Sequence, residues 1–89
     1  MEYRIINSLE DLKKECLAQP NDYVHFRISL TGGMSFSSKR ILYFSDENRF
    51  FVINEIDESY HDNISEKELF ENTLIGEAIR KNCLFRSAL

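Results

Sequence analysis

KRILYFSDENRFFVINEI, residues 39–56, is the stretch that decides the fold. Two runs rich in aromatic and β-branched residues, 39–45 and 49–56, are separated by the polar residues DEN at 46–48. Such runs are typical of strands, and a short polar connection between two of them indicates a β-hairpin. The sequence therefore predicts an antiparallel pair of strands in the middle of the chain.

The segment before this hairpin predicts a further strand. In YVHFRISL, residues 23–30, apolar residues alternate with His25, Arg27 and Ser29. A period of two over this length indicates a strand with one buried face and one more polar face.

Two helices are predicted from apolar spacing and capping residues. Residues 9–18 repeat apolar side chains at helical intervals behind Ser8, whose hydroxyl can accept a hydrogen bond from a first-turn amide. Ser65 and Glu68 form the S-x-x-E capping box of a second helix. That helix is expected to bend near ENT and to continue through LIGEAIRKN, with Asn82 as its terminator.

These segments predict an α+β fold, with residues 1–89 as a single domain. Short strands are also expected at 2–6 and, as an edge strand, at 83–85, whereas the acidic stretch DESYHDN at 57–63 is expected to be a loop. The architecture that follows is a small antiparallel sheet of three to four strands with two or three helices packed on one face.

Composition predicts a folded protein of the cytoplasm. The chain is 43% hydrophobic, and no apolar run approaches the ~20 residues that crossing a membrane requires. The first residues lack the basic start and apolar stretch of a signal peptide. Cys16 and Cys83 form no CxxC pair, so reduced thiols are expected, with a disulfide between them left open as an alternative.

Negative charge is concentrated in one part of the chain. Residues 45–71 carry nine Asp and Glu against two Lys and Arg, a net charge of −7 within a total of −4. Proteins that bind duplex DNA usually show the opposite, a basic stripe along one face. Direct binding of duplex DNA is therefore not expected.

The segment TGGMSFSSKR, residues 31–40, has some features of a phosphate-binding loop. Ser38 stands where such a loop has its second glycine, Arg40 replaces the metal-binding hydroxyl, and the following ILYF predicts a strand instead of a helix. A turn between strands is therefore expected. Two alternatives stay open for Lys39 and Arg40: contact with an anionic group of a partner, or an exposed strand edge that discourages unwanted pairing.

Neither a cofactor nor a metal ion is expected. The acidic residues of 54–62 lack the glycine and the spacing of an EF-hand, and the nucleophile and base signatures of hydrolases are absent. Nothing in the spacing of His25 or His61 pairs either histidine with a cysteine as a catalytic couple. Enzyme activity is therefore not predicted.

The acidic segment is the strongest candidate for a binding surface. Carboxylates beside an aromatic residue suit a basic partner surface, although they can also serve solubility alone. The candidate partner-binding residues are Glu55, Asp57, Glu58, Tyr60 and Asp62, together with Lys39 and Arg40 on the neighbouring strand.

Four short motifs carry a family resemblance. SSK at 37–39, NEID at 54–57, EKEL at 66–69 and IGEAI at 75–79 resemble a group of short bacterial and mobile-element proteins without an established activity. The resemblance covers about half of the chain and implies no catalytic residue. In size and acidity the chain is also similar to small phage-encoded inhibitors of bacterial defence, including anti-CRISPR proteins.

Three functions follow as hypotheses. The first is a non-catalytic protein-binding module, most concretely an inhibitor that docks its acidic face on a basic surface of a defence nucleoprotein such as an RNA-guided nuclease. The second is a housekeeping or regulatory small protein that forms a homodimer through a sheet edge. The third is a minor enzyme or metal binder that uses the Cys, His and Asp residues.

Overall fold

The fold is α+β, as the sequence predicts. The computed structural model describes residues 3–29, 37–54 and 60–87. Its elements, in chain order, are β1 (Tyr3–Ile5), α1 (Leu9–Leu17), β2 (Val24–Ile28), β3 (Ser37–Phe44), β4 (Arg49–Asn54), β5 (Tyr60–Ser65), α2 (Glu66–Asn72), α3 (Leu74–Arg80) and β6 (Leu84–Ser87).

The strands form one antiparallel sheet in the order β1-β6-β2-β3-β4-β5. The prediction of three to four strands was too low, because the described residues contain six. The hairpin of β3 and β4 is confirmed, with Lys39 opposite Asn54 and Phe44 opposite Arg49.

Two sequence predictions about the sheet were wrong. The stretch 57–63 was expected to be a loop, but its residues 60–63 belong to β5 (Tyr60–Ser65), which pairs with β4 across an irregularity between Phe50 and Val52. Pairing with a neighbouring strand outweighs the weak strand preference of YHDNIS. The short strand near the C-terminal end was expected at an edge, but β6 lies between β1 and β2.

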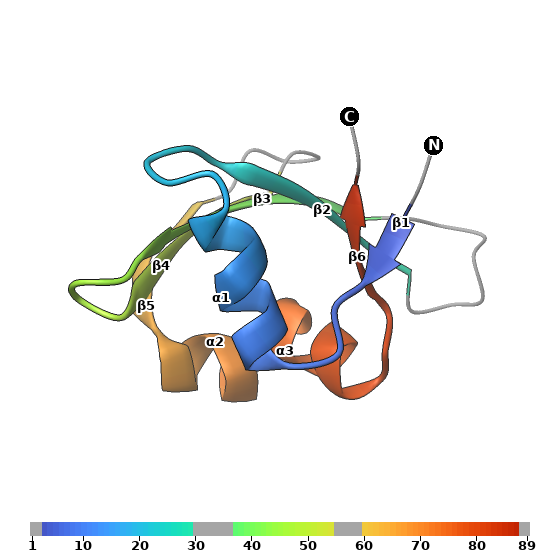
Figure 1. Ribbon diagram of the computed structural model, residues 1–89. Coiled ribbons are helices and arrows are strands. Elements are labelled where there is room, and N and C mark those ends of the chain that lie inside the picture. Colours follow the sequence, from blue (N-terminus) through green and yellow to red (C-terminus); the bar gives the residue numbers. More distant parts are fainter. Residues whose placement is uncertain (1–2, 30–36, 55–59, 88–89) are drawn as a thin grey trace.

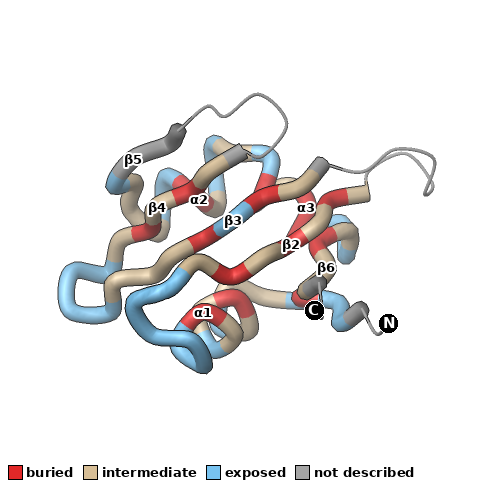
Figure 2. The backbone as a smooth tube through the Cα atoms, turned by 90° about the horizontal axis from the view of Figure 1, so that it is seen from above, coloured by how far each residue is buried: buried red, intermediate tan, exposed pale blue. Residues whose placement is uncertain are grey.

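All three described helices lie on the same side of the sheet (Figure 1). The core fills the space between the two layers, and along the strands buried residues alternate with less buried ones (Figure 2). The buried apolar residues are Ile6, Leu12, Cys16, Val24, Phe26, Ile28, Ile41, Phe50, Val52, Leu69, Ile75, Ala78, Ile79 and Leu84. In the described part of the chain, no helix combines the length and the apolarity that crossing a membrane requires.

The predicted caps set the helix boundaries. The Ser8 hydroxyl accepts from the amide of Asp11 at 3.1 Å, and the Ser65 hydroxyl accepts from the amide of Glu68 at 3.1 Å. The predicted bend separates α2 from α3. Asn82, with a φ of 57°, lies in the left-handed region just after α3, as expected of a terminator.

A tight corner joins α2 and α3. The Thr73 hydroxyl donates to the Leu69 carbonyl at 2.5 Å and accepts from the amide of Gly76 at 3.4 Å. Gly76 is buried against the end of α2, and a Cβ atom there would lie 1.9 Å from the Phe70 carbonyl oxygen. The corner therefore requires a residue without a side chain at position 76.

Candidate functional site

The predicted acidic surface lies partly within the described structure. Glu55, Asp57 and Glu58 lie outside the described residues. Tyr60 and Asp62 belong to β5, the last strand at one edge of the sheet, although their side chains lie outside the described part. The backbone thus carries two of the five acidic-surface residues along a sheet edge.

Lys39 and Arg40 point to opposite sides of an inner strand, so the alternative that placed them on an exposed strand edge was wrong. β3 is an inner strand between β2 and β4. Lys39 faces the helices, is only 6% exposed, and makes a contact within the molecule. It lines a small hollow with Val52, Ile64, Thr73, Leu74 and Ile75. Arg40 is exposed on the side away from the helices, because successive side chains of a strand alternate.

The rest of the acidic segment runs along α2. Glu68 and Glu71 are exposed, and Glu68 accepts a hydrogen bond from the Asn72 side chain at 3.2 Å. Glu66 has a different role, because Lys13 of α1 lies 2.6 Å from one of its oxygens and Asn48 donates to the other at 2.6 Å. One carboxylate of the segment is therefore paired inside the molecule.

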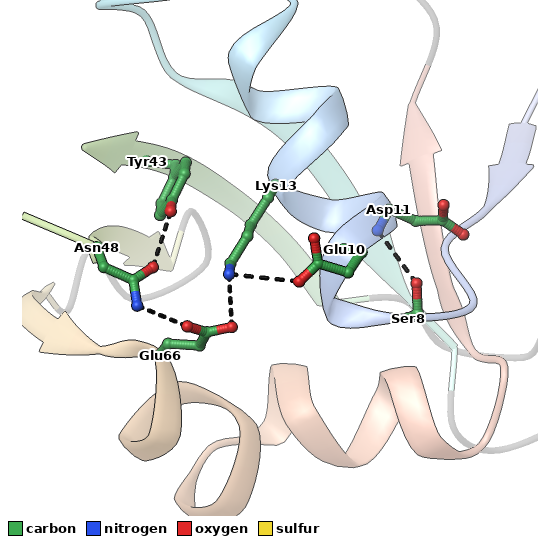
Figure 3. Close-up of polar contacts among 7 residues, drawn as sticks. All are labelled: Ser8, Glu10, Asp11, Lys13, Tyr43, Asn48 and Glu66. Atoms are coloured by element: carbon green, nitrogen blue, oxygen red, sulfur yellow. Dashed lines mark hydrogen bonds and ion pairs between the residues drawn. The ribbon is translucent and has the colours of Figure 1, made fainter. Parts of the chain in front are cut away.

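Glu66 belongs to a network that joins four parts of the fold (Figure 3). Tyr43 of β3 donates to Asn48 at 2.8 Å, and Asn48 lies in the β3–β4 turn. Lys13 also lies 3.5 Å from a carboxylate oxygen of Glu10. The hydrogen bond with Lys13 is the main cause that lowers the pKa of Glu66, and the same bond raises the pKa of Lys13. The network fixes both charges, which suits a structural role.

The cysteines and histidines do not come together as a catalytic couple among the described side chains. Cys16 is buried, and loss of solvation raises the pKa of its thiol to about 12. Cys83 is partly buried, and both thiols are free. His25 is half-buried in β2, whereas the side chain of His61 lies outside the described part. The described residues contain no group of three or more His, Cys, Asp and Glu arranged to hold a metal ion.

The hollows formed by described residues are small. One of about 280 Å³ lies between the start of α1 and the end of α3, lined by Asn7, Ser8, Leu9, Phe70, Ile79, Arg80 and Asn82. Typical small-molecule sites range from about 300 to 1,000 Å³ and enclose most of their ligand. This hollow is below that range.

The side of the sheet away from the helices is the main feature that sequence reasoning missed. We call it the open face, because no described helix lies over it (Figure 1). Successive side chains of a strand point to opposite faces, so the residues next to the buried ones along each strand lie on the open face. The open face consists of Ile5, His25, Arg27, Ser38, Arg40, Leu42, Phe44, Arg49, Phe51, Ile53 and Phe85.

A signal for the open face was present in the sequence. In ILYF (41–44) and FFVI (50–53) the apolar residues do not alternate with polar ones. Leu42, Phe44, Phe51 and Ile53, which point away from the core, are as apolar as the residues that point into it. Continuous apolar runs are typical of strands that are covered on both faces. The helices cover one face, so the composition of β3 and β4 favours a partner on the other.

Comparison of the chain with protein-family models, with curated proteins and with solved structures finds no match.

Proposed function

We propose that the protein is a non-catalytic binding module of the cytoplasm that docks on a basic surface of a larger protein. The observation that carries this proposal is the position of the acidic segment. β5 forms an edge of the sheet and leads directly into α2, so Asp62, Glu66, Glu68 and Glu71 follow one another along β5 and α2, which we call the acidic border.

Electrostatics explains how such a border would act. Carboxylates on a protruding edge attract a basic partner over about a Debye length and raise the association rate, and salt weakens the effect. Glu68 and Glu71 are exposed on α2 and would extend the field of the residues at 55–62. Glu66 contributes less, because Lys13 already neutralises it.

The most concrete version is an inhibitor from a phage or mobile element that acts on a bacterial defence nucleoprotein, such as an RNA-guided nuclease. The resemblance of SSK, NEID, EKEL and IGEAI to mobile-element proteins supports it, as does the likeness in size and acidity to anti-CRISPR proteins. An acidic edge of this kind can occupy a channel that normally holds phosphates.

Charge reversal tests the docking surface once a partner has been captured from host lysate and identified by mass spectrometry, with and without nuclease treatment. We expect a variant with Asp57→Lys, Glu58→Lys and Asp62→Lys to bind that partner at least about tenfold more weakly, by titration calorimetry.

The matched control changes Asp11, Asp22 and Glu77 to Lys, three acidic residues outside the acidic segment at 45–71. The affinity of this control for the partner should stay within about threefold of that of the unmodified chain, because docking is expected to depend on the position of the charges and not on net charge alone. Equal losses in both variants, or no loss in either, would contradict docking through the acidic border.

A homodimer through a sheet edge is a second candidate, favoured by the two outer strands. β1 and β5 each pair on one side only among the described strands, and an exposed strand edge is a template for pairing with another chain. Size-exclusion chromatography over a concentration series separates the two proposals, because docking on a larger protein requires no dimer.

A further inference from the structure

A group of basic side chains occupies the middle of the open face. His25 and Arg40 lie directly opposite each other on β2 and β3, and Arg27 lies two residues further along β2, opposite Ser38. Directly paired side chains are about 5 Å apart and diagonal neighbours about 7–8 Å apart. The three basic side chains therefore form one patch, although they come from separate stretches of the sequence.

Apolar and aromatic side chains flank this patch on both sides. Beyond Arg40 the face continues with Leu42 opposite Phe51, and the rings of Phe44 and Phe51 meet edge to face with their centroids 5.1 Å apart. On the other side of the patch, Phe85 of β6 lies directly opposite Arg27. These side chains are partly exposed.

The charges on the open face select the kind of partner. None of the described side chains that face this way is a carboxylate. Two copies of the chain packed face to face would bring their cationic patches together, which disfavours self-association through this surface. An anionic partner complements the patch.

The aromatic residues on both sides of the patch narrow the choice of anionic partner further. Single-stranded nucleic acid needs basic groups for its phosphates and aromatic rings on which unpaired bases stack. An acidic peptide would use the cations but leave the flat rings without a matching group. A duplex would keep its bases enclosed and could use only the charges.

We propose that the open face of the sheet binds single-stranded nucleic acid, with His25, Arg27 and Arg40 against the phosphates and Phe44, Phe51 and Phe85 against the bases. This inference goes beyond the acidic border and does not depend on it. The basic side chains also make contacts within the molecule, so they are held in position on the sheet. A nucleoprotein target would offer a partner to both surfaces.

The test is fluorescence anisotropy with labelled oligothymidine and oligouridine of about 12 nucleotides, a length that single-strand-binding domains commonly cover. The expected dissociation constant at low salt is about 1–100 μM, and it should rise severalfold between about 50 and 200 mM salt. A duplex of the same length should bind at least about fivefold more weakly, because its bases cannot stack on the rings.

Three variants locate the site. Arg40→Gln should weaken binding about threefold or more and reduce the salt dependence, and Phe51→Leu, which keeps an apolar side chain, should weaken it about fivefold or more through lost stacking. Lys67→Gln is the charge-matched control, since Lys67 is exposed on α2 on the other side of the sheet, and its affinity should not change.

Several outcomes would overturn the proposal. They are absence of binding at low salt, equal losses in Arg40→Gln and Lys67→Gln, duplex binding as tight as single-strand binding, or competition by polyglutamate as effective as by unlabelled oligonucleotide. The last result would assign the face to an acidic protein segment. Circular dichroism melts of each variant establish that a loss of binding is not a loss of fold.

Discussion

A single missing side chain sets how closely α2 and α3 approach each other. At Gly76 the backbone of α3 meets the carbonyl groups of Leu69 and Phe70 at the end of α2. These are backbone atoms that cannot rotate away as a flexible side chain would. The glycine of the IGEAI motif thus has a structural explanation that requires no ligand.

Gly76→Ala is expected to lower the free energy of unfolding by about 3 kcal/mol, near the upper end of the usual cost of overpacking. The added methyl group would lie 1.9 Å from the Phe70 carbonyl oxygen, so the two helices must move apart. Urea denaturation followed by circular dichroism measures the change.

Asn72→Ala, at an exposed position near the same corner, is the control for this substitution and should change stability by less than about 1 kcal/mol. A Gly76→Ala chain as stable as the unmodified one would mean that the corner has room for a methyl group.

Lys39 and Arg40 show that local sequence alone does not determine which of two neighbouring strand residues is buried. Neighbouring residues of a strand face opposite sides, so one sequence run supplies both a buried and an exposed cation. The alternation was visible, but the choice of which face the helices cover depends on α2 and α3, which come more than 20 residues later in the chain.

At the scale of elements, the network of Lys13, Glu66 and Asn48 fastens α1 and the β3–β4 turn to the start of α2 (Figure 3). The side chains of Lys13 and Glu66 are 16% and 27% exposed, so the pair is better shielded from water than a typical surface pair. Its contribution depends on the charges of both partners.

Glu66→Gln is therefore expected to lower the free energy of unfolding by about 1 kcal/mol at neutral pH. The pKa of Glu66 is below its ordinary value of 4.5 in the folded chain, so its stabilisation is present above pH 4.5 and disappears as the pH falls through the folded-state pKa. Urea denaturation at about pH 7 and about pH 3 should show a smaller difference between the two chains at the lower pH.

The contribution of Lys13 to stability depends on pH in the opposite direction. Its pKa is raised above 10.5 in the folded chain, so its contribution is complete below pH 10.5 and is lost only as the pH rises through the raised value.

Glu71→Gln, at an exposed position on the same helix as Glu66, is the matched control for Glu66→Gln. If Glu71→Gln costs as much as Glu66→Gln, the network is not the cause.

Most elements could be predicted from the sequence, because their signals are local. The capping serines, the hairpin and the terminating Asn82 each depend on a few adjacent residues. β5 could not be predicted, since YHDNIS has no apolar alternation and becomes a strand by pairing with β4. The apolar residues at both alternating positions of β3 and β4 were a local signal for the open face, but its grouping with His25, Arg27 and Phe85 could not be predicted, because those residues come from strands that meet only after folding.

At the scale of the whole molecule, the two proposed surfaces lie on different elements and differ in charge. Asp62, Glu66, Glu68 and Glu71 belong to β5 and α2, whereas His25, Arg27 and Arg40 of the open face belong to β2 and β3. The modest net charge of −4 conceals this difference. The two proposed surfaces can therefore be tested independently, since the substitutions for one do not touch the other.

β6 holds the ends of the described chain together. The amide of Ile6 donates to the Leu84 carbonyl at 2.8 Å, and Leu84 is completely buried. Leu84→Ala is expected to lower the free energy of unfolding by about 2–5 kcal/mol, the usual cost of a cavity in a core. Chemical denaturation followed by intrinsic tyrosine fluorescence measures it.

Leu17→Ala is the matched control, because it makes the same chemical change at a residue that is 46% exposed. Its expected cost is about 1 kcal/mol or less. Similar losses at the two positions would contradict the interior placement of β6.

The order of the strands also has a consequence for how the protein is made. β1 is translated well before its sheet partner β6, because almost all the other described elements lie between them in the chain. The two strands of the β3–β4 hairpin are close in the chain and can pair while synthesis continues. β1 and the edge of β2 that pairs with β6 must wait until β6 has been made. Nascent chains stalled before residue 84 should therefore resist proteases poorly and recruit chaperones until they are released.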